Sequence, residues 1–449
     1  MRTLLFIGMI LLVVATAWAQ VVSRNSEPVV NAEDRMLIPA PASGETYPTG
    51  LSSEEPSNYL HYGLMFSAGY SDNLLGAATP TGRAVSDVNY SLWPTIGFDK
   101  STSRLHWGLT YAPGFTFYQR TSERNEADHN ALLAFEYRLS PHVTFSAHDS
   151  FQKSSNVLNQ PSFAPADAVS GGAQGPNASV IAPVADRLSH VGSLGLTYQY
   201  AANEMVGMNG TFGNLHYGNS TNVGGLSDDS SQSGSAFYSH RLANRHYFGA
   251  IYQYQRLMTY PSGLDSETQT HAVLGFYTVY PSTRFSLSLF GGPQYAETAQ
   301  PALPTFELAA YSSRAWSPAA GASLNWQGRF TGGALSYSHT IRSGGGLMGA
   351  VRLDQASVAG RAQFTPTLSA SLSGFYANNQ MIGPSVGSSN GHTFEGTVGV
   401  QRRFGEHLGA DLGYSRIHQT YSVPVLSMNP DTNRVFVSVS YSFNRPWGR

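Results

Sequence analysis

Residues 435–443 read Val435-Phe436-Val437-Ser438-Val439-Ser440-Tyr441-Ser442-Phe443. Apolar side chains occupy every second position, and serines fill most of the positions between them. Successive side chains of an extended strand point to opposite faces, so the segment predicts a β-strand with one apolar and one polar face.

The same two-residue period recurs from Tyr62 onward, in segments of about ten residues separated by turns. The clearest of these segments are Leu105–Tyr111, Leu133–Leu139, Leu194–Tyr200, Phe285–Leu289 and Leu408–Tyr414. This repetition predicts an all-β chain without interposed helices.

Two kinds of connection alternate along the chain. Tight turns are predicted at residues 100–102, 140–141, 201–203, 243–245, 281–283, 327–328, 366–367 and 405–406. Longer connections rich in Gly, Ser, Asn and Pro lie between them, the largest at 154–186 and others at 218–232, 297–314 and 421–432. Short turns on one side and long loops on the other are typical of outer-membrane barrels. Pairing the tight turns with the loops predicts about 18 strands. Sixteen is the alternative, because 233–243 and 315–325 alternate weakly.

The composition indicates where such a sheet would reside. Only 12% of the 449 residues are charged, against about 25% in an ordinary soluble protein, while aromatic residues make up 12% and glycine occurs 46 times. Past the first twenty residues no apolar run is long enough for a spanning helix. An open sheet would leave unpaired backbone groups in lipid, so the sequence predicts a closed antiparallel transmembrane β-barrel.

Charge and cysteine content exclude several functional classes. The net charge of −2 offers no basic face for nucleic acid, and the lack of cysteine excludes disulfides and thiolate metal sites.

The N-terminus predicts export. Arg2, the apolar run Leu4–Ala15 and the small-x-small sequence Ala17-Trp18-Ala19 are typical of a signal peptide over residues 1–19. A membrane anchor helix is the alternative, but the apolar run is shorter than the ~20 residues needed to span. Residues 20–58, rich in Pro, Ser and acids, predict a flexible periplasmic extension, with a short plug or partner-binding segment as the alternative. Residues 59–449 would form the barrel, in the outer membrane of a Gram-negative-type bacterium.

The final strand resembles the signal by which barrels are handed to their assembly machinery. The resemblance rests on the alternating residues Val437, Val439, Tyr441 and Phe443. The departure is the tail Asn444–Arg449, which is either a tolerated extension or places Trp447 in an aromatic girdle.

The first two hundred residues resemble the outer-membrane β-barrel porins of the second type, a family associated with exopolysaccharide and capsule genes. The resemblance is carried by Gly69–Leu74, Ser86–Val88, Leu92–Pro94, Tyr111–Tyr118, Asp128–Asn130, Tyr137–Pro141 and Ser146–Phe151. It covers about half the chain and implies a porin-like or polysaccharide-associated barrel, with no catalytic residues to carry over.

Alternation assigns a set of polar and charged side chains to the barrel lumen. These are His106, Glu136, Arg138, His148, Arg361 and Asp411. Groups of both signs in a pore set its ion preference, and in a closed barrel they would pair as packing. About 18 strands enclose a space too wide for side chains to fill, which favours the pore.

Three sequence patterns suggest chemistry that their context does not support. His148, Asp149 and Ser150 are neighbours on a strand, so they cannot converge as a catalytic triad. The Gly344-x-Gly346-x-x-Gly349 pattern lies between two strands and predicts a flexible loop rather than a dinucleotide site. The acidic pairs Asp228-Asp229 and Asp265/Glu267 are interpreted as solvated loop residues. No catalytic, cofactor or metal site is therefore predicted.

The sequence leaves three functional hypotheses. The first is a porin-like channel or conduit for polar solutes, with an association with exopolysaccharide export as its more specific form. The alternative is a structural or adhesive barrel acting through its long loops, and a barrel enzyme is third. The expected partners are outer-membrane lipid and lipopolysaccharide, the barrel-assembly machinery and polysaccharide export components; the sequence does not indicate an oligomeric state.

Overall fold

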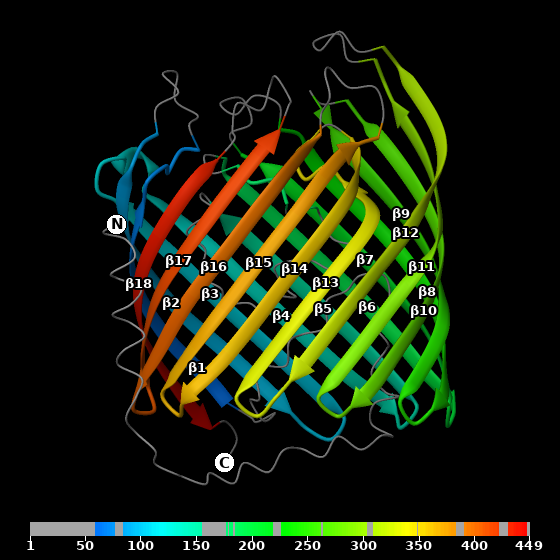
Figure 1. Ribbon diagram of the computed structural model, residues 1–449, viewed down its shortest axis with the longest axis horizontal. Helices are drawn as coiled ribbons and strands as arrows, with labels where there is room; N and C mark the ends of the chain where they lie inside the picture. Colours follow the sequence, from blue (N-terminus) through cyan, green and yellow to red (C-terminus); the bar gives the residue numbers. More distant parts are fainter. Residues whose placement is uncertain are drawn as a thin grey trace, which may run out of the picture. The chain divides into compact units, whose positions relative to one another are not determined.

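The computed structural model is an antiparallel β-barrel of 18 strands (Figure 1). The structure describes residues 59–76, 84–154, 177, 179–182, 185–218, 226–261, 264–302, 309–347, 349–382, 390–421 and 430–446. The predicted signal peptide, the extension up to residue 58 and Trp447 lie outside these described residues.

The strands follow one another around the ring in chain order. Their bounds are β1 (Tyr59–Ser71), β2 (Asp87–Ser101), β3 (Leu105–Tyr118), β4 (Glu126–Ser140), β5 (Val143–Ser154), β6 (Arg187–Ala201), β7 (Glu204–Tyr217), β8 (Asp228–Ala243), β9 (His246–Tyr260), β10 (Ser266–Ser282), β11 (Phe285–Gln300), β12 (Tyr311–Gln327), β13 (Thr331–Ser343), β14 (Ala350–Thr365), β15 (Leu368–Met381), β16 (Gly391–Phe404), β17 (Leu408–Tyr421) and β18 (Asp431–Pro446). A single 3-10 turn, η2 (Ser122–Arg124), follows β3 among the described residues.

The ring closes through the first and last strands. β1 and β18 pair antiparallel from Tyr59↔Pro446 to Ser71↔Arg434. The predictions of a closed antiparallel barrel and of 18 strands are confirmed, and the weakly alternating segments are β8 and β12.

The two ends of the barrel differ in the length of their connections, as the sequence predicts. All eight tight turns fall at one end, here called the turn end, and the strand ends that the longer connections join lie at the other, the loop end (Figure 1). Three of the longer connections are shorter than expected, because flanking strands extend to residues 228, 300, 311 and 431. None of the described residues forms a helix with the length and hydropathy to cross a bilayer.

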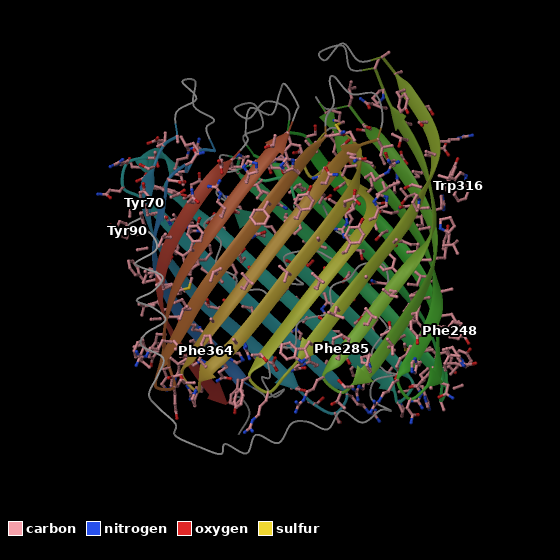
Figure 2. The ribbon with its side chains drawn as sticks, in the orientation of Figure 1. Tyr70, Tyr90, Phe248, Phe285, Trp316 and Phe364 are labelled. Carbon is pink, nitrogen blue, oxygen red and sulfur yellow. The ribbon has the colours of Figure 1, made fainter. Side chains whose placement is uncertain are left out.

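Large apolar side chains cover the outer face of the ring. Figure 2 shows Tyr70, Tyr90 and Trp316 toward the loop end and Phe248, Phe285 and Phe364 toward the turn end. Between these two levels lie exposed residues such as Leu64, Leu194, Met208, Leu335, Leu372 and Val437. Serine, threonine, glutamine and glycine are frequent on the opposite, inner face, which follows from the two-residue period.

Several aromatic rings on the inner face lie flat against the wall rather than extending into the interior. In each case the ring covers a glycine directly opposite on the neighbouring strand, where an added Cβ would overlap the ring. The pairs are Gly207/Phe237, Gly249/Phe276, Gly321/Phe290, Gly391/Tyr421 and Gly413/Phe436. Such aromatic cover compensates for the poor strand propensity of glycine and fixes the register.

We predict that Gly249→Ala destabilises the barrel by about 1–3 kcal/mol, because the new methyl group must displace Phe276 and the Tyr238 carbonyl. The matched control is Gly234→Ala on β8, where an added Cβ meets nothing within 4 Å. Urea unfolding in lipid vesicles measures both. Equal stability of the two variants would contradict the role assigned to the ring cover.

Candidate functional site

The barrel interior is the candidate site, and its width is set by the strand count. Eighteen strands spaced ~4.8 Å apart and tilted by ~40° enclose a backbone diameter of roughly 36 Å. Side chains from opposite walls cannot meet across that distance. Any contact between opposite walls therefore requires another part of the chain to fill the space.

Such contacts exist at the loop end. One buried cluster contains Leu215 and Tyr217 of β7 together with Val351 and Leu353 of β14, Ala377 of β15 and Tyr421 of β17. β7 and β17 lie ten strands apart in one direction around the ring of 18 and eight in the other, so the cluster joins nearly opposite walls. Residues from three connecting segments complete the cluster: Val180, Ala182 and Ala185 between β5 and β6, Leu347 between β13 and β14, and Leu226 between β7 and β8.

The first of these segments is the described part of the connection between β5 and β6, residues 177, 179–182 and 185–186, here called the crossing segment. Its apolar residues Val180, Ile181 and Ala182 are at most 4% exposed. It contacts side chains of β15 and β17, which lie across the ring from β5 and β6. The crossing segment therefore lies inside the barrel.

Amide side chains on the far wall hold the crossing segment. The Ile181 N–H donates to Gln419 Oε1 at 2.7 Å, and Gln419 Nε2 donates to the Ile181 carbonyl at 2.9 Å. Asn177 Nδ2 donates to Asn379 Oδ1 at 2.9 Å, and Asn379 Nδ2 donates to the hydroxyls of Ser179 and Tyr421. Asn379 and Gln419 are almost fully buried, so these bonds form away from bulk water.

The second segment is the tip of the β13–β14 hairpin, residues 340–347 and 349–353. Every residue from Thr340 to Leu347 is buried. Ile341 packs against Leu257 of β9 and Ala296 of β11, which are inner-face residues of another part of the wall. The hairpin tip therefore leaves the wall and lies inside the barrel.

Hydrogen bonds join the hairpin tip to β7, β8 and β9. The Gly346 N–H donates to Asp229 Oδ2 at 3.0 Å, the Tyr217 hydroxyl donates to the Gly345 carbonyl at 2.9 Å, and the Gly349 N–H donates to Thr259 Oγ1. All three glycines have positive φ, which explains their place in this turn. The prediction of a flexible loop at 344–349 is wrong, because the glycines shape a buried and hydrogen-bonded turn.

The two inward segments also contact each other. A Cβ added to Gly345 would lie against the Asn177 carbonyl, and the Asn177 N–H donates to Ser343 Oγ at 3.1 Å. Together they pack the interior at the loop end.

The six residues predicted to line the lumen all lie on the inner face, in the part of their strands nearer the turn end. His106 is directly opposite Glu136, and Arg138 Nε lies 4.0 Å from Glu136 Oε1. His148 follows on β5, whereas Arg361 on β14 and Asp411 on β17 lie on other parts of the wall. His148 is close enough to Glu136 and His106 to interact with them electrostatically, so the structure brings four of the six together. The Glu136 and Arg138 side chains are about half exposed, so solvent reaches this part of the interior.

The neighbouring residues His148, Asp149 and Ser150 do not converge. Asp149 points outward and its Oδ1 lies 2.7 Å from His190 Nε2, whereas His148 and Ser150 share the inner face. Asp228 and Asp229 are likewise divided, since Asp228 accepts from the outward His216 and Asp229 faces the hairpin tip. Within the described residues, no group of three or more His, Asp or Glu side chains is arranged to hold a metal ion.

The sequence interpretation missed both inward segments. One signal was available: Val351 and Leu353 occupy inner-face positions of β14, where most other strands carry small polar residues. Apolar residues at the inner positions near a loop indicate that something apolar packs on them. Asn379, Gln419 and Tyr421 gave no such signal, because amides and tyrosines are also common on hydrated inner faces.

We predict that cysteines at Ile181 and Ile417, which form one buried cluster, react with a short bifunctional thiol reagent. The natural chain has no cysteine, so a shift in electrophoretic mobility reports this link alone. The matched control pairs Ile181 with Ile251, an inner-face isoleucine of β9. Linkage of the control pair, or none of Ile181 to Ile417, would contradict the placement of the crossing segment.

No protein-family model matches the chain, and no curated protein matches it. Among solved structures it is similar to the ferric citrate transporter FecA in its unliganded form, with 10% identity, coverage of 90% of this chain and 69% of that chain, and a TM-score of 0.45. OccAB4 of Acinetobacter baumannii has 11% identity, coverage of 88% and 100%, and a TM-score of 0.41. OpdO of Pseudomonas aeruginosa has 12% identity, coverage of 86% and 97%, and a TM-score of 0.41. These likenesses are too distant to indicate which solute, if any, this chain carries.

Proposed function

We propose that the chain is an outer-membrane channel for polar solutes whose interior is closed at the loop end by two displaceable segments. The exposed apolar belt around the closed ring is the observation that supports the membrane placement. A soluble protein rarely exposes an apolar patch beyond a few hundred Å², and here such residues surround the barrel. The accessible charged groups of the inner face near the turn end support a hydrated interior.

The closing segments suit a gate better than a permanent core. They are held by non-covalent contacts, and each hydrogen bond contributes about 1 kcal/mol net because water replaces it when the segment moves out. The crossing segment and the hairpin tip both connect strands at the loop end, so they can move without breaking the ring.

The solute we favour is polar and weakly charged, and an exopolysaccharide is the specific class that we propose from the family resemblance. The inner face supports this choice with hydroxyl and amide groups such as Ser233, Gln253, Gln294, Ser336 and Thr397. Lipopolysaccharide around the belt, the barrel-assembly machinery at β18 and polysaccharide export components are the proposed partners. Val437, Val439, Tyr441 and Phe443 of the proposed assembly signal all face outward and are exposed.

A structural or adhesive barrel is the second candidate function. The packed loop end favours it, since a lumen closed by its own chain would present a continuous surface to the exterior. Conductance measurements separate the two candidates.

We predict that Gln419→Leu increases the open fraction in planar-bilayer recordings by roughly 30-fold, because it removes the two hydrogen bonds between this side chain and the crossing segment, which together contribute about 2 kcal/mol. The matched control is Gln401→Leu, on the inner face of β16 nearer the turn end. If neither the natural protein nor Gln419→Leu conducts above leak, the channel proposal fails and the structural barrel is favoured.

We predict that Arg138→Glu shifts the ion selectivity toward cations, with a change in permeability ratio of roughly twofold, because it reverses an accessible inner-face charge. Arg402→Glu is the control, since Arg402 lies on the outer face of β16 over the Phe404 ring. Reversal potentials across a salt gradient measure the effect. An equal shift from both variants would show that Arg138 does not line the conducting path.

A further inference from the structure

The barrel wall divides between β12 and β13 at the loop end. Their pairing runs from Gln327↔Gly332 to Ala320↔His339 and then stops. On its other side, β12 stays paired with β11 up to Gln300↔Tyr311. The part of β12 from Tyr311 to Ala319 therefore has no described strand beside it on the β13 side. We call this place the β12 edge.

A proline explains why the pairing stops there. Pro318 lies directly opposite Pro293 of β11. Two prolines cannot form a hydrogen-bonded pair, so both direct their backbone nitrogens away from each other, and that of Pro318 points toward β13. β13 would need a donor at that position. The Pro318 carbonyl, which points to the same side as its nitrogen, accepts a hydrogen bond from the Ser317 hydroxyl at 3.2 Å.

The separation is completed by the inward course of β13. Ile341, the residue that would face Pro318, packs against Leu257 and Ala296 inside the barrel. Because backbone groups alternate along a strand, the N–H and C=O groups of Ser312, Arg314 and Trp316 point the same way as the nitrogen and carbonyl of Pro318. These groups are directed into the split and lack a partner strand there.

The side chains around the split combine aromatic rings with charged pairs. Trp316 is 72% exposed, and its ring centroid lies 5.3 Å from that of Tyr295. Arg314 Nη2 lies 2.8 Å from Glu297 Oε1 on one border, and His339 Nδ1 lies 2.6 Å from Asp354 Oδ1 on the other. Figure 2 places Trp316 toward the loop end, as it does Tyr70 and Tyr90.

Acyl chains cannot satisfy the β12 edge, because unpaired backbone groups cost several kcal/mol each in hydrocarbon. A ligand at this level must offer hydroxyl groups to the backbone, contact an aromatic face and tolerate charges of both signs. A sugar headgroup meets these requirements. Resting on the outer-membrane placement in the proposed function, we propose that the β12 edge is a binding site for the sugar headgroup of a glycolipid of the outer leaflet.

Native mass spectrometry of the full chain in detergent tests this inference, with lipopolysaccharide of short glycan length as the probe. We expect Trp316→Ala and Pro318→Val to retain at least fivefold less of this glycolipid than the natural protein. The first variant removes the aromatic face, and the second restores the donor that β13 needs. Trp326→Ala is the matched control, because Trp326 is an exposed outer-face tryptophan of β12 at the turn end, and it should retain the glycolipid.

Two further arms identify the ligand. Phosphatidylglycerol, an anionic lipid without a comparable glycan, should not compete, and the free core oligosaccharide should bind at least tenfold more weakly than the glycolipid. Equal loss from both tryptophan variants, full competition by phosphatidylglycerol or equally tight binding of the free oligosaccharide would overturn the proposal. So would a dimer of the natural protein that Pro318→Val abolishes, since a second copy would then cover the edge.

The test of the glycolipid site can fail without the channel proposal failing, and the reverse also holds. Glycolipid retention is measured in detergent and needs no conductance. A conducting barrel that retains no glycolipid would overturn only the binding site. A non-conducting barrel that retains it through Trp316 would overturn only the channel.

Discussion

The continuous ring of backbone hydrogen bonds is the constraint on which the rest of this structure depends. Because β1 and β18 close the ring, the strands satisfy one another and need no apolar core between opposite walls. That frees the inner face to carry serine, threonine and amide side chains, while the outer face carries the apolar belt. Among the described strands, the longest departure, at the β12 edge, coincides with a proline that removes a donor from the ladder.

A ring of 18 strands also creates a problem that side chains alone do not solve, since the interior is too wide for them. The crossing segment and the hairpin tip fill this space. Side chains of the wall hold them by hydrogen bonds to their backbone groups, as the strands of a sheet hold one another. Gln419 offers a donor and an acceptor to the backbone of Ile181, as a neighbouring strand would. Asp229 and Thr259 accept hydrogen bonds from the N–H groups of Gly346 and Gly349 in the glycine turn. Buried polar side chains thus replace a partner strand where none can reach.

The sequence was sufficient to predict the ring and insufficient to predict its filling, for one physical reason. Strand alternation and turn chemistry are local, so the final strand, the eight tight turns and the inner positions of His106 and Glu136 follow from neighbours in sequence. The crossing segment depends on contacts between residues about 200 apart, such as Asn177 with Asn379. A loop rich in small residues has the same composition whether it extends outward or folds inward. Val351 and Leu353, with Leu215 of β7, were the apolar inner-face residues that marked the place where it packs.

The contact between the crossing segment and the hairpin tip has a consequence for how the interior opens. Val180 and Leu347 belong to one buried cluster, and Asn177 bonds to Ser343 at the base of the tip. Moving either segment alone exposes apolar surface of the other, at about 25 cal/mol for each Å² uncovered. Moving both together exposes less surface per segment, because their mutual contact is kept. If the barrel conducts as proposed, its interior therefore favours two states, filled or open, over a series of partly open ones, as expected of a gate built from packed elements.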